Sequence, residues 1–195
     1  MTTADRILSA ARDVYLSAGL QGFSMRKVAV RVGVSATALY RHYRNKEELI
    51  GSVINEGFRL FEQLLFEALP GKSPADRLQR SGLAYMRFGL AHPEYYRLIF
   101  MSTAHDHGFR NVTLQSPAKL SKAFMFLVDR VRECRDAGIV GGADPLELAA
   151  VLWSFWHGLV SLELGGHYRP VLKTRAEFEA FFARSSTSFI ERMKP

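Results

Sequence analysis

The chain has 195 residues, 26 Lys and Arg against 19 Asp and Glu, and a formal net charge of +7. Its hydrophobic content of 48% is typical of a folded globular chain and argues against disorder. A single cysteine, Cys134, excludes an internal disulfide and a zinc site built from four thiolates. No uninterrupted apolar run approaches the roughly 20 residues that cross a bilayer, and the start of the chain is polar. We therefore expect a soluble, reduced protein of the cytoplasm that spans no membrane.

Apolar residues recur at helical spacing, Gly and Pro separate the periodic segments, and no alternating run of Val, Ile or Thr indicates a strand. Residues 101–115 are polar and contain glycine, which predicts a loop. The predicted helices cover about residues 3–18, 24–32, 35–43, 45–69, 74–91, 93–100, 117–137, 145–164 and 175–193. The predicted fold is therefore all-α, with about nine helices.

The positive charge is concentrated in one short stretch. Residues 24–46 hold six Lys and Arg and no Asp or Glu, whereas the other 172 residues hold 20 basic and 19 acidic groups. Such a cluster suits a polyanion, because each cation placed on a phosphate releases condensed counterions. A basic helix face that is merely solvated is the alternative. Thirteen of the 14 Phe and both Trp lie after residue 57, so a small basic module precedes an aromatic-rich body.

Two short helices joined through Gly33 have the layout of a helix-turn-helix. Each begins with a serine, Ser24 or Ser35, whose hydroxyl can cap exposed amide N–H groups. The apolar residues suited to hold the two helices together are Val28, Ala29, Val32, Val34 and Leu39. The residues then left to face outward on the second helix are Ser35, Thr37, Ala38, Arg41 and His42. A second helix of this kind, placed in the major groove, presents its N-terminal residues to base edges.

The side chains of this module have the chemistry of DNA contacts. Arg41 can donate two hydrogen bonds to guanine, a pairing that discriminates between bases by roughly 1–3 kcal/mol. Arg26 could do the same or bind phosphate, and the methyl groups of Thr37 and its two neighbouring alanines could touch thymine. Lys46 lies at the start of the fourth helix, whose free amide groups can bind phosphate. Polar groups that suit the phosphate backbone, which positions a protein without specifying sequence, belong to Tyr40, His42, Tyr43 and Lys46.

The stretch GLQGFSMRKVAVRVGVSATALYRHYRNKEELIGSVI resembles the DNA-binding module of the TetR family of bacterial transcriptional repressors. The similar features are the Gly-Phe-Ser entry, VAVRVGVS, LYRHY and the NKEEL that opens the next helix. The resemblance implies a helix-turn-helix DNA-binding domain over residues 1–46 and a helical ligand-binding and dimerisation domain over residues 47–195. It also implies a dimer that binds a near-palindromic operator on double-stranded DNA and is released by a small molecule. Carried over by motif position, the DNA contacts would be Ser24, Arg26, Ser35, Thr37, Tyr40, His42 and Lys46, with Ala36, Ala38 and Arg41 at the variable recognition positions.

The segment FWHGLVSLEL, residues 155–164, resembles a TetR subgroup with a Trp-His-Gly motif in its penultimate helix. The predicted helix around it is apolar nearly all round, so it needs cover on every side, and a partner chain would supply the part that its own domain does not. The last helix carries Phe at similar spacing, and two such helices from each chain would form a four-helix bundle about a twofold axis, where Gly158 would permit close approach. We therefore predict a homodimer through the last two helices, with a large single-chain core as the alternative. A dimer also suits DNA, because two reading helices about 34 Å apart match successive major grooves.

A pocket between helices is the expected site for a small-molecule effector in such a body. The aromatic composition favours an apolar or aromatic effector with few hydrogen bonds, and His157 is the polar group best suited to face it. The alternatives are a histidine that caps or bridges helices and aromatic residues that only fill the core. The candidate ligand-binding residues are Phe58, Phe61, Tyr85, Phe88, Phe100, Phe124, Trp153, Trp156 and His157.

No cofactor, metal site or catalytic group is predicted. The triplet His105-Asp106-His107 lies in a polar segment without further ligands at fixed spacing. Ser154, His157 and Ser161 lie one turn apart on one helix, but no acid is evident to orient the histidine, so we do not expect an enzyme. The alternative function is a small-molecule-binding helical sensor that acts through protein partners without binding DNA.

Overall fold

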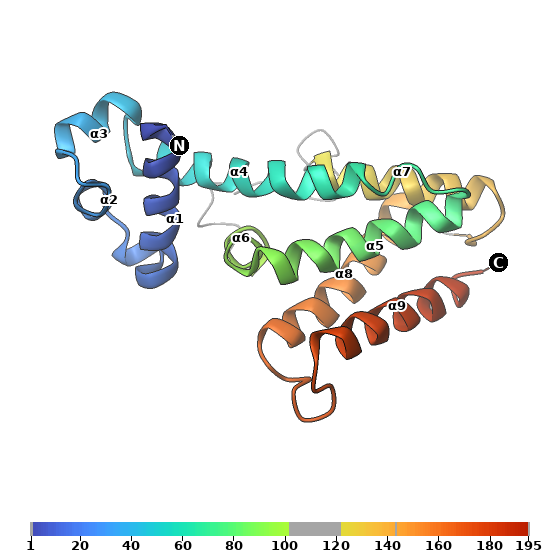
Figure 1. Cartoon of the computed structure of the whole chain (residues 1–195). Coiled ribbons are helices and arrows are strands. Elements are labelled where there is room, and N and C mark those ends of the chain that lie inside the picture. The colour runs from blue at the N-terminus through green and yellow to red at the C-terminus, as the bar shows by residue number, and fades with distance from the viewer. Residues whose placement is uncertain (1, 102–121, 143, 195) are drawn as a thin grey trace. The chain divides into compact units, whose positions relative to one another are not determined.

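The computed structural model describes residues 2–101, 122–142 and 144–194, and every regular element in these ranges is a helix (Figure 1). The elements are α1 (Thr3–Gly22), α2 (Met25–Val32), α3 (Ala36–His42), α4 (Lys46–Phe66), α5 (Pro74–Ala91), α6 (Pro93–Tyr96), the π-helical turn η1 (Arg97–Met101), α7 (Lys122–Asp136), α8 (Pro145–Leu164) and α9 (Arg175–Glu191). The all-α prediction is confirmed, with nine α-helices over these ranges.

The described residues fall into two compact units. The first contains α1, α2, α3, the part of α4 up to Arg59, α6 and η1. The second contains the rest of α4 from Leu60 together with α5, α7, α8 and α9. The boundary between these units therefore lies within α4. The division at residue 46, between a DNA-binding domain and a ligand-binding and dimerisation domain, stays a prediction.

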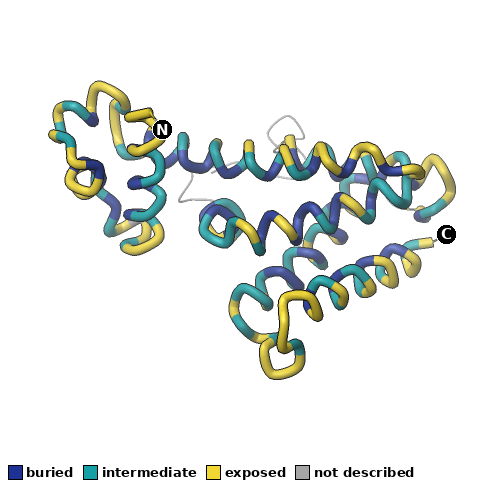
Figure 2. The backbone as a smooth tube through the Cα atoms, in the orientation of Figure 1, coloured by how far each residue is buried: buried dark blue, intermediate teal, exposed yellow. Residues whose placement is uncertain are grey.

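The helix-turn-helix of the first unit rests on α1, which packs against α2, while α2 packs against α3. Ile7 and Ala11 of α1, Val28 of α2 and Leu39 of α3 are buried with at most 2% of their surface exposed. Figure 2 shows that buried and exposed positions alternate along these helices, as amphipathic helices require. The apolar positions predicted to hold the two short helices together are confirmed as buried, except Val34, which is half-buried.

Local signals set the ends of α2 and α3. The hydroxyl oxygen of Ser24 accepts a hydrogen bond from the Lys27 amide at 3.2 Å, and that of Ser35 accepts from the Ala38 amide at 3.1 Å. Gly33 adopts a left-handed φ of +78°, and its amide donates to the Ala29 carbonyl at 3.0 Å. This conformation suits a residue without a side chain, and it ends α2 and turns the chain into α3.

The second unit is arranged around α5, which packs against α7, α8 and α9. Gly82 of α5 permits a close approach, because an added Cβ would lie 2.6 Å from indole carbons of Trp156 on α8. The Trp156 indole N–H donates to the Ser186 hydroxyl at 2.9 Å, and that hydroxyl donates to the Gln79 side-chain oxygen at 3.1 Å. One buried polar chain therefore joins α5, α8 and α9, which lie together in Figure 1.

Several boundaries differ from the predicted ones. α1 continues to Gly22, and Gly19, with a φ of +61°, marks a kink rather than its end. α4 ends at Phe66, because turn hydrogen bonds replace helical ones in the residues that follow. The predicted helix at 93–100 divides into α6 and η1. Met101, predicted as the first residue of the loop at 101–115, is instead the last residue of η1. The rest of that predicted loop, the His105-Asp106-His107 triplet and the first residues of the predicted helix at 117–137 lie outside the described residues.

Of the helices in the described ranges, α8 alone is long and apolar enough to cross a membrane, with a mean hydropathy of 1.2 over its most apolar window. The core helix of a soluble protein can have the same length and composition. Leu152 and Val160 of α8 are fully buried, and α8 packs against three neighbouring helices. These contacts hold α8 in the second unit and bury 33% of that window.

Candidate nucleic-acid interface

α3 presents a nearly continuous polar face. Leu39 is its one buried residue, while the side chains of Thr37, Arg41 and His42 are exposed and Tyr40 is 52% exposed. Ser35, which caps α3, is exposed as well. The outward positions predicted for this helix are therefore exposed, except Ala38, which is half-buried. The arrangement leaves donors, acceptors and a methyl group available to a partner.

The two capping serines retain part of their hydrogen-bonding capacity. Each hydroxyl oxygen of Ser24 and Ser35 accepts from an amide of its own helix. A hydroxyl has one proton in addition to its acceptor positions. Each serine can therefore stabilise its helix and, through that proton, donate to a phosphate at the same time.

In the fold, an acidic side chain from outside the basic stretch at residues 24–46 offsets part of its positive charge. The Arg31 guanidinium lies 3.0 Å from a carboxylate oxygen of Asp13 on α1. Asp13 precedes the stretch by more than two helical turns, so no local sequence pattern indicates this pair. Arg26 and Arg41 are exposed. The pairing makes Arg31 a weaker candidate for contact with an external anion than Arg26, Arg41 and the likewise exposed Arg44.

Two lysines of the stretch also make contacts inside the first unit. The Lys27 ammonium donates to the Gly22 carbonyl at 2.8 Å. The Lys46 ammonium lies 5.9 Å from the ring centre of Phe23, within the range of a cation–π interaction. Both contacts hold a lysine over the segment that precedes α2, which restricts where each ammonium can meet a phosphate.

The start of α4 is already capped by its own side chains. The Asn45 side-chain oxygen accepts from the Glu48 amide at 2.8 Å, and the Glu48 carboxylate accepts from the Arg44 amide at 2.6 Å. The Glu48 amide is therefore not one of the free amides that were predicted to bind phosphate at the start of this helix. Lys46 itself remains the group best placed there to meet an anion.

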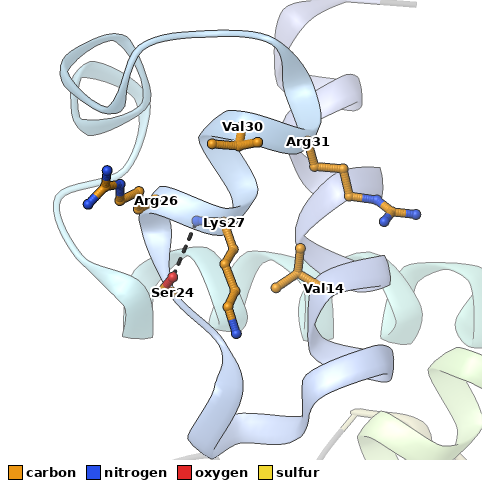
Figure 3. A pocket seen from close by; sticks show the side chains of 6 residues that line it. All are labelled: Val14, Ser24, Arg26, Lys27, Val30 and Arg31. Atoms are coloured by element: carbon orange, nitrogen blue, oxygen red, sulfur yellow. Dashed lines mark hydrogen bonds between the residues drawn. The ribbon is translucent and has the colours of Figure 1, made fainter.

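A shallow concavity of about 630 Å³ lies between α1 and α2 (Figure 3). Val30 on its wall is 75% exposed, a large fraction for an apolar side chain. The concavity shares Ser24 and Arg26 with the predicted DNA contacts. Its lining residues are Val14, Ser24, Arg26, Lys27, Val30 and Arg31.

Six of the nine candidate ligand-binding residues meet in the second unit, around Tyr85. The Tyr85 hydroxyl accepts from the Trp153 indole N–H at 3.2 Å and lies 3.0 Å from Nδ1 of His157. Burial lowers the pKa of His157 below its usual value of 6.5. The neutral imidazole, favoured at pH 7, can accept the Tyr85 proton at Nδ1.

Aromatic rings extend this group on both sides. Phe61 packs against Tyr85 and Phe88, with ring centres 5.6 and 4.9 Å apart. Phe124 packs edge-on against Trp153 at 5.8 Å. The result is a mostly apolar cluster with one polar line through it, in agreement with the kind of surroundings expected for an apolar ligand. Whether these residues bind a ligand stays a prediction.

The other three candidate ligand-binding residues make contacts of their own. Phe58 and Phe100 pack together in the first unit, with ring centres 6.4 Å apart. Trp156 is 2% exposed and directs its indole N–H to Ser186 on α9. Phe58 and Phe100 thus belong to the first unit, and Trp156 joins α8 to α9.

One face of α8 remains open in the single chain. Val151 is 52% exposed and Leu162 is 42% exposed. A Cβ added at Gly158 would meet nothing within 4 Å. Phe155 stacks on Phe189 of α9 with ring centres 4.2 Å apart, which joins the two helices side by side. An exposed apolar face of this kind favours a protein partner.

Two protein-family models match the chain. One, described as bacterial regulatory proteins of the tetR family, matches residues 7–53 and includes the helix-turn-helix. The other, described as a tetracyclin repressor-like C-terminal domain, matches residues 78–185, which include α8 and most of α9. The matches together cover both the capped helix pair and the aromatic body.

Similar proteins include transcriptional regulators and solved structures of the same fold. The transcriptional repressor DrrR1 of Streptomyces coeruleorubidus is 34% identical over 74 residues, which are 38% of this chain and 24% of that protein. A putative tetR family regulator from Shewanella sp. PV-4 superposes with a TM-score of 0.76 at 14% identity, over 100% of this chain and 98% of that one. AibR, solved in complex with isovaleryl coenzyme A and operator DNA, gives a TM-score of 0.69 at 20% identity over 96% and 97%. These structural likenesses show a shared fold, and the chain spans 24–39% of the length of the curated relatives it matches.

Proposed function

This chain belongs to the TetR family of bacterial regulatory proteins, and from that membership we propose that it represses transcription in the cytoplasm by binding a near-palindromic operator as a dimer. A small apolar or aromatic effector releases the dimer from DNA. The Trp156-His157-Gly158 sequence on α8 supports its assignment to the subgroup that carries this motif.

The exposed face of α3 is the observation that carries the proposal. Thr37, Tyr40 and Arg41 project from a two-turn helix whose only buried side chain is Leu39. A helix of this size fits the major groove, and exposed side chains on it reach base edges. Because α3 is held by α2 and capped at Ser35, the face is ordered before DNA arrives.

The contacts divide into reading and positioning groups. Arg41 reads bases, because its guanidinium can pair with guanine, and Thr37 offers a methyl group to thymine. Arg26 has the chemistry for either role. The groups that position the duplex through its phosphates are Ser24, Ser35, Tyr40, His42 and Lys46.

The open face of α8 supports the dimer. Val151 and Leu162 would be covered by a second copy of the chain, and Gly158 would let the two copies of α8 approach closely. With α9 alongside, each chain contributes two helices to a four-helix bundle about a twofold axis. The same axis relates two copies of α3 and makes the preferred operator a near-palindrome.

The aromatic group around Tyr85 supports the effector site. The rings of Phe61, Phe88 and Phe124 offer apolar contact, while Tyr85 and His157 offer a few polar atoms. AibR, whose solved structure contains both isovaleryl coenzyme A and operator DNA, is a protein of this fold with both kinds of partner. We extend that pairing of partners to this chain, with a smaller and more apolar effector.

Selection from a random pool of DNA duplexes tests the function. The wild-type chain should enrich one near-palindromic sequence, and its affinity for that duplex should fall at least about a hundredfold between about 50 and 200 mM salt because phosphate contacts dominate. Enrichment of no sequence, or an affinity that ignores salt, would contradict the proposal. It would favour a sensor that acts through protein partners.

A further inference from the structure

The helix-turn-helix is connected to α4 and α6 by a continuous row of five polar and aromatic side chains. This polar row lies entirely within the first unit. It begins on α2, crosses α1 and α6, and ends on α4. In order its members are Arg31, Asp13, Arg12, Tyr95 and Glu56.

The first half of the row links α2 to α1 through one carboxylate. Asp13 receives Arg31 at 3.0 Å on one oxygen and Arg12 at 3.2 Å on the other. The pairs are partly exposed, so each alone stabilises the fold little. Sharing one carboxylate nevertheless fixes both guanidinium groups relative to α1, because each restricts the rotamers left to the other.

The second half links α1 to α6 and α4 through Tyr95. The Arg12 guanidinium lies 5.6 Å from the centre of the Tyr95 ring, and the Tyr95 hydroxyl donates to a Glu56 carboxylate oxygen at 2.6 Å. Tyr95 is 3% exposed. Burial raises the pKa of Tyr95 to about 12, so the hydroxyl keeps its proton at neutral pH. A hydrogen bond of this length to a carboxylate oxygen is among the stronger ones in proteins.

Tyr95 packs closely against the backbone of α4. A Cβ added at Gly57 would lie 2.7 Å from a methyl carbon of Ile99 and 2.8 Å from a ring carbon of Tyr95. Only glycine therefore allows α6 and η1 to lie this close to α4. The Tyr95 ring is confined between that backbone and Arg12, so its hydroxyl has little freedom to leave Glu56.

We propose that Tyr95 is a positioning residue for DNA binding, which fixes the module of α1, α2 and α3 on α4 and α6 by joining Arg12 to Glu56. The close helix packing inside this module runs from α1 to α2 and from α2 to α3. The polar row continues that packing to α4 and α6 through side chains. Its effect is to hold α3 at one angle in each copy of the dimer, and therefore to set the spacing between half-sites that the dimer prefers. This inference rests on the proposed function.

Tyr95→Phe tests it, since the variant keeps the ring and removes the hydroxyl, which interacts with both Glu56 and Arg12. The probes are the duplex selected by the wild-type chain, a duplex with one half-site, and duplexes whose half-sites are moved apart or together by a base pair or two. Half-site affinity should stay within about twofold. Affinity for the full site should fall about tenfold, and the spacing preference should flatten. Equal losses on half and full sites, or an unchanged spacing preference, would overturn the inference.

Glu56 supplies a matched pair of variants. Glu56→Gln keeps an acceptor oxygen for Tyr95 and should retain the spacing preference, whereas Glu56→Ala should flatten it. Tyr168→Phe removes a tyrosine hydroxyl in the second unit and should leave the preference unchanged. If circular dichroism shows that Tyr95→Phe does not fold, Arg12→Gln replaces it in the same binding measurements, because it breaks the row on the other side of Tyr95.

The two levels of proposal fail in different ways. A wild-type chain that selects no duplex overturns both the proposed function and this inference. A wild-type chain that selects a near-palindrome with a defined spacing, and a Tyr95→Phe chain with the same spacing, overturn the inference alone.

Discussion

At the scale of the residue, Arg41 and Lys46 differ in whether they can discriminate between DNA sequences. Arg41 is exposed on α3, whereas Lys46 lies over the Phe23 ring at the start of α4. Arg41→Ala should cost roughly 1–3 kcal/mol on the selected duplex and relax the preference at one position of each half-site. Lys46→Ala should weaken binding to all duplexes alike and lower the salt slope by about 1 per contact removed. Affinities of both variants for the selected duplex and its single-base variants check this, and identical profiles would contradict the division into reading and positioning residues.

His157 gives the stability of the chain a pH dependence. Burial lowers the pKa of its imidazole in the folded state below the usual 6.5, so between these two values the unfolded chain binds more protons. The contribution of His157 to the free energy of unfolding is therefore fully present above pH 6.5. It declines as the pH falls toward the pKa of His157 in the folded state. Chemical unfolding at pH 7.5 and 5.5, at one protein concentration, should show a smaller difference for His157→Gln than for the wild type. His167→Gln, at an exposed position in the turn after α8, is the control and should leave the difference unchanged.

At the scale of the element, the approach of α5 to α8 depends on Gly82. Because its added Cβ would lie 2.6 Å from the Trp156 ring, Gly82→Ala should destabilise the fold by about 1–3 kcal/mol through overpacking. Gly51→Ala on α4 is the matched control. Its Cβ would meet nothing within 4 Å, so removing a glycine there should stabilise the helix by roughly 0.5–1 kcal/mol. Denaturant midpoints and Trp fluorescence report both changes, and a neutral Gly82→Ala would show that α5 and α8 can move apart freely.

The elements also show why sequence reasoning succeeds for some features and not for others. The serine caps, the Gly33 turn and the inward face of α2 are local, since each depends on residues within one or two helical turns, and the sequence predicts them. The Arg31–Asp13 pair and the Tyr95–Glu56 bond join residues far apart in the chain, and no spacing rule indicates them. The aromatic candidates show the same limit. Helical periodicity marks Phe58, Tyr85 and Trp156 alike as core-facing, but only the packing of separate helices decides which cluster each joins.

At the scale of the whole molecule, the two units divide the chemistry between them. The first presents exposed donors and cations on short helices and has a polar row behind them. The second has an aromatic cluster with few polar atoms and an apolar helix face. A duplex with two half-sites is bound tightly only if the second unit pairs two chains, because one module alone contacts a single half-site. The affinity for DNA should therefore also depend on residues of the second unit that do not contact DNA themselves.

Val151 and Leu162 test that dependence. Each is exposed on α8, so a charge there costs a single chain little, whereas in a dimer it would be buried without a partner. Val151→Glu, alone or with Leu162→Glu, should convert the dimer to a folded monomer and weaken full-site binding at least about a hundredfold, with half-site affinity unchanged. Val171→Glu is the control, because Val171 is 77% exposed in the turn between α8 and α9 and off this face. Sedimentation analysis with circular dichroism checks the assembly and the fold, and a Val151→Glu, Leu162→Glu chain that remains dimeric would place the dimer interface elsewhere.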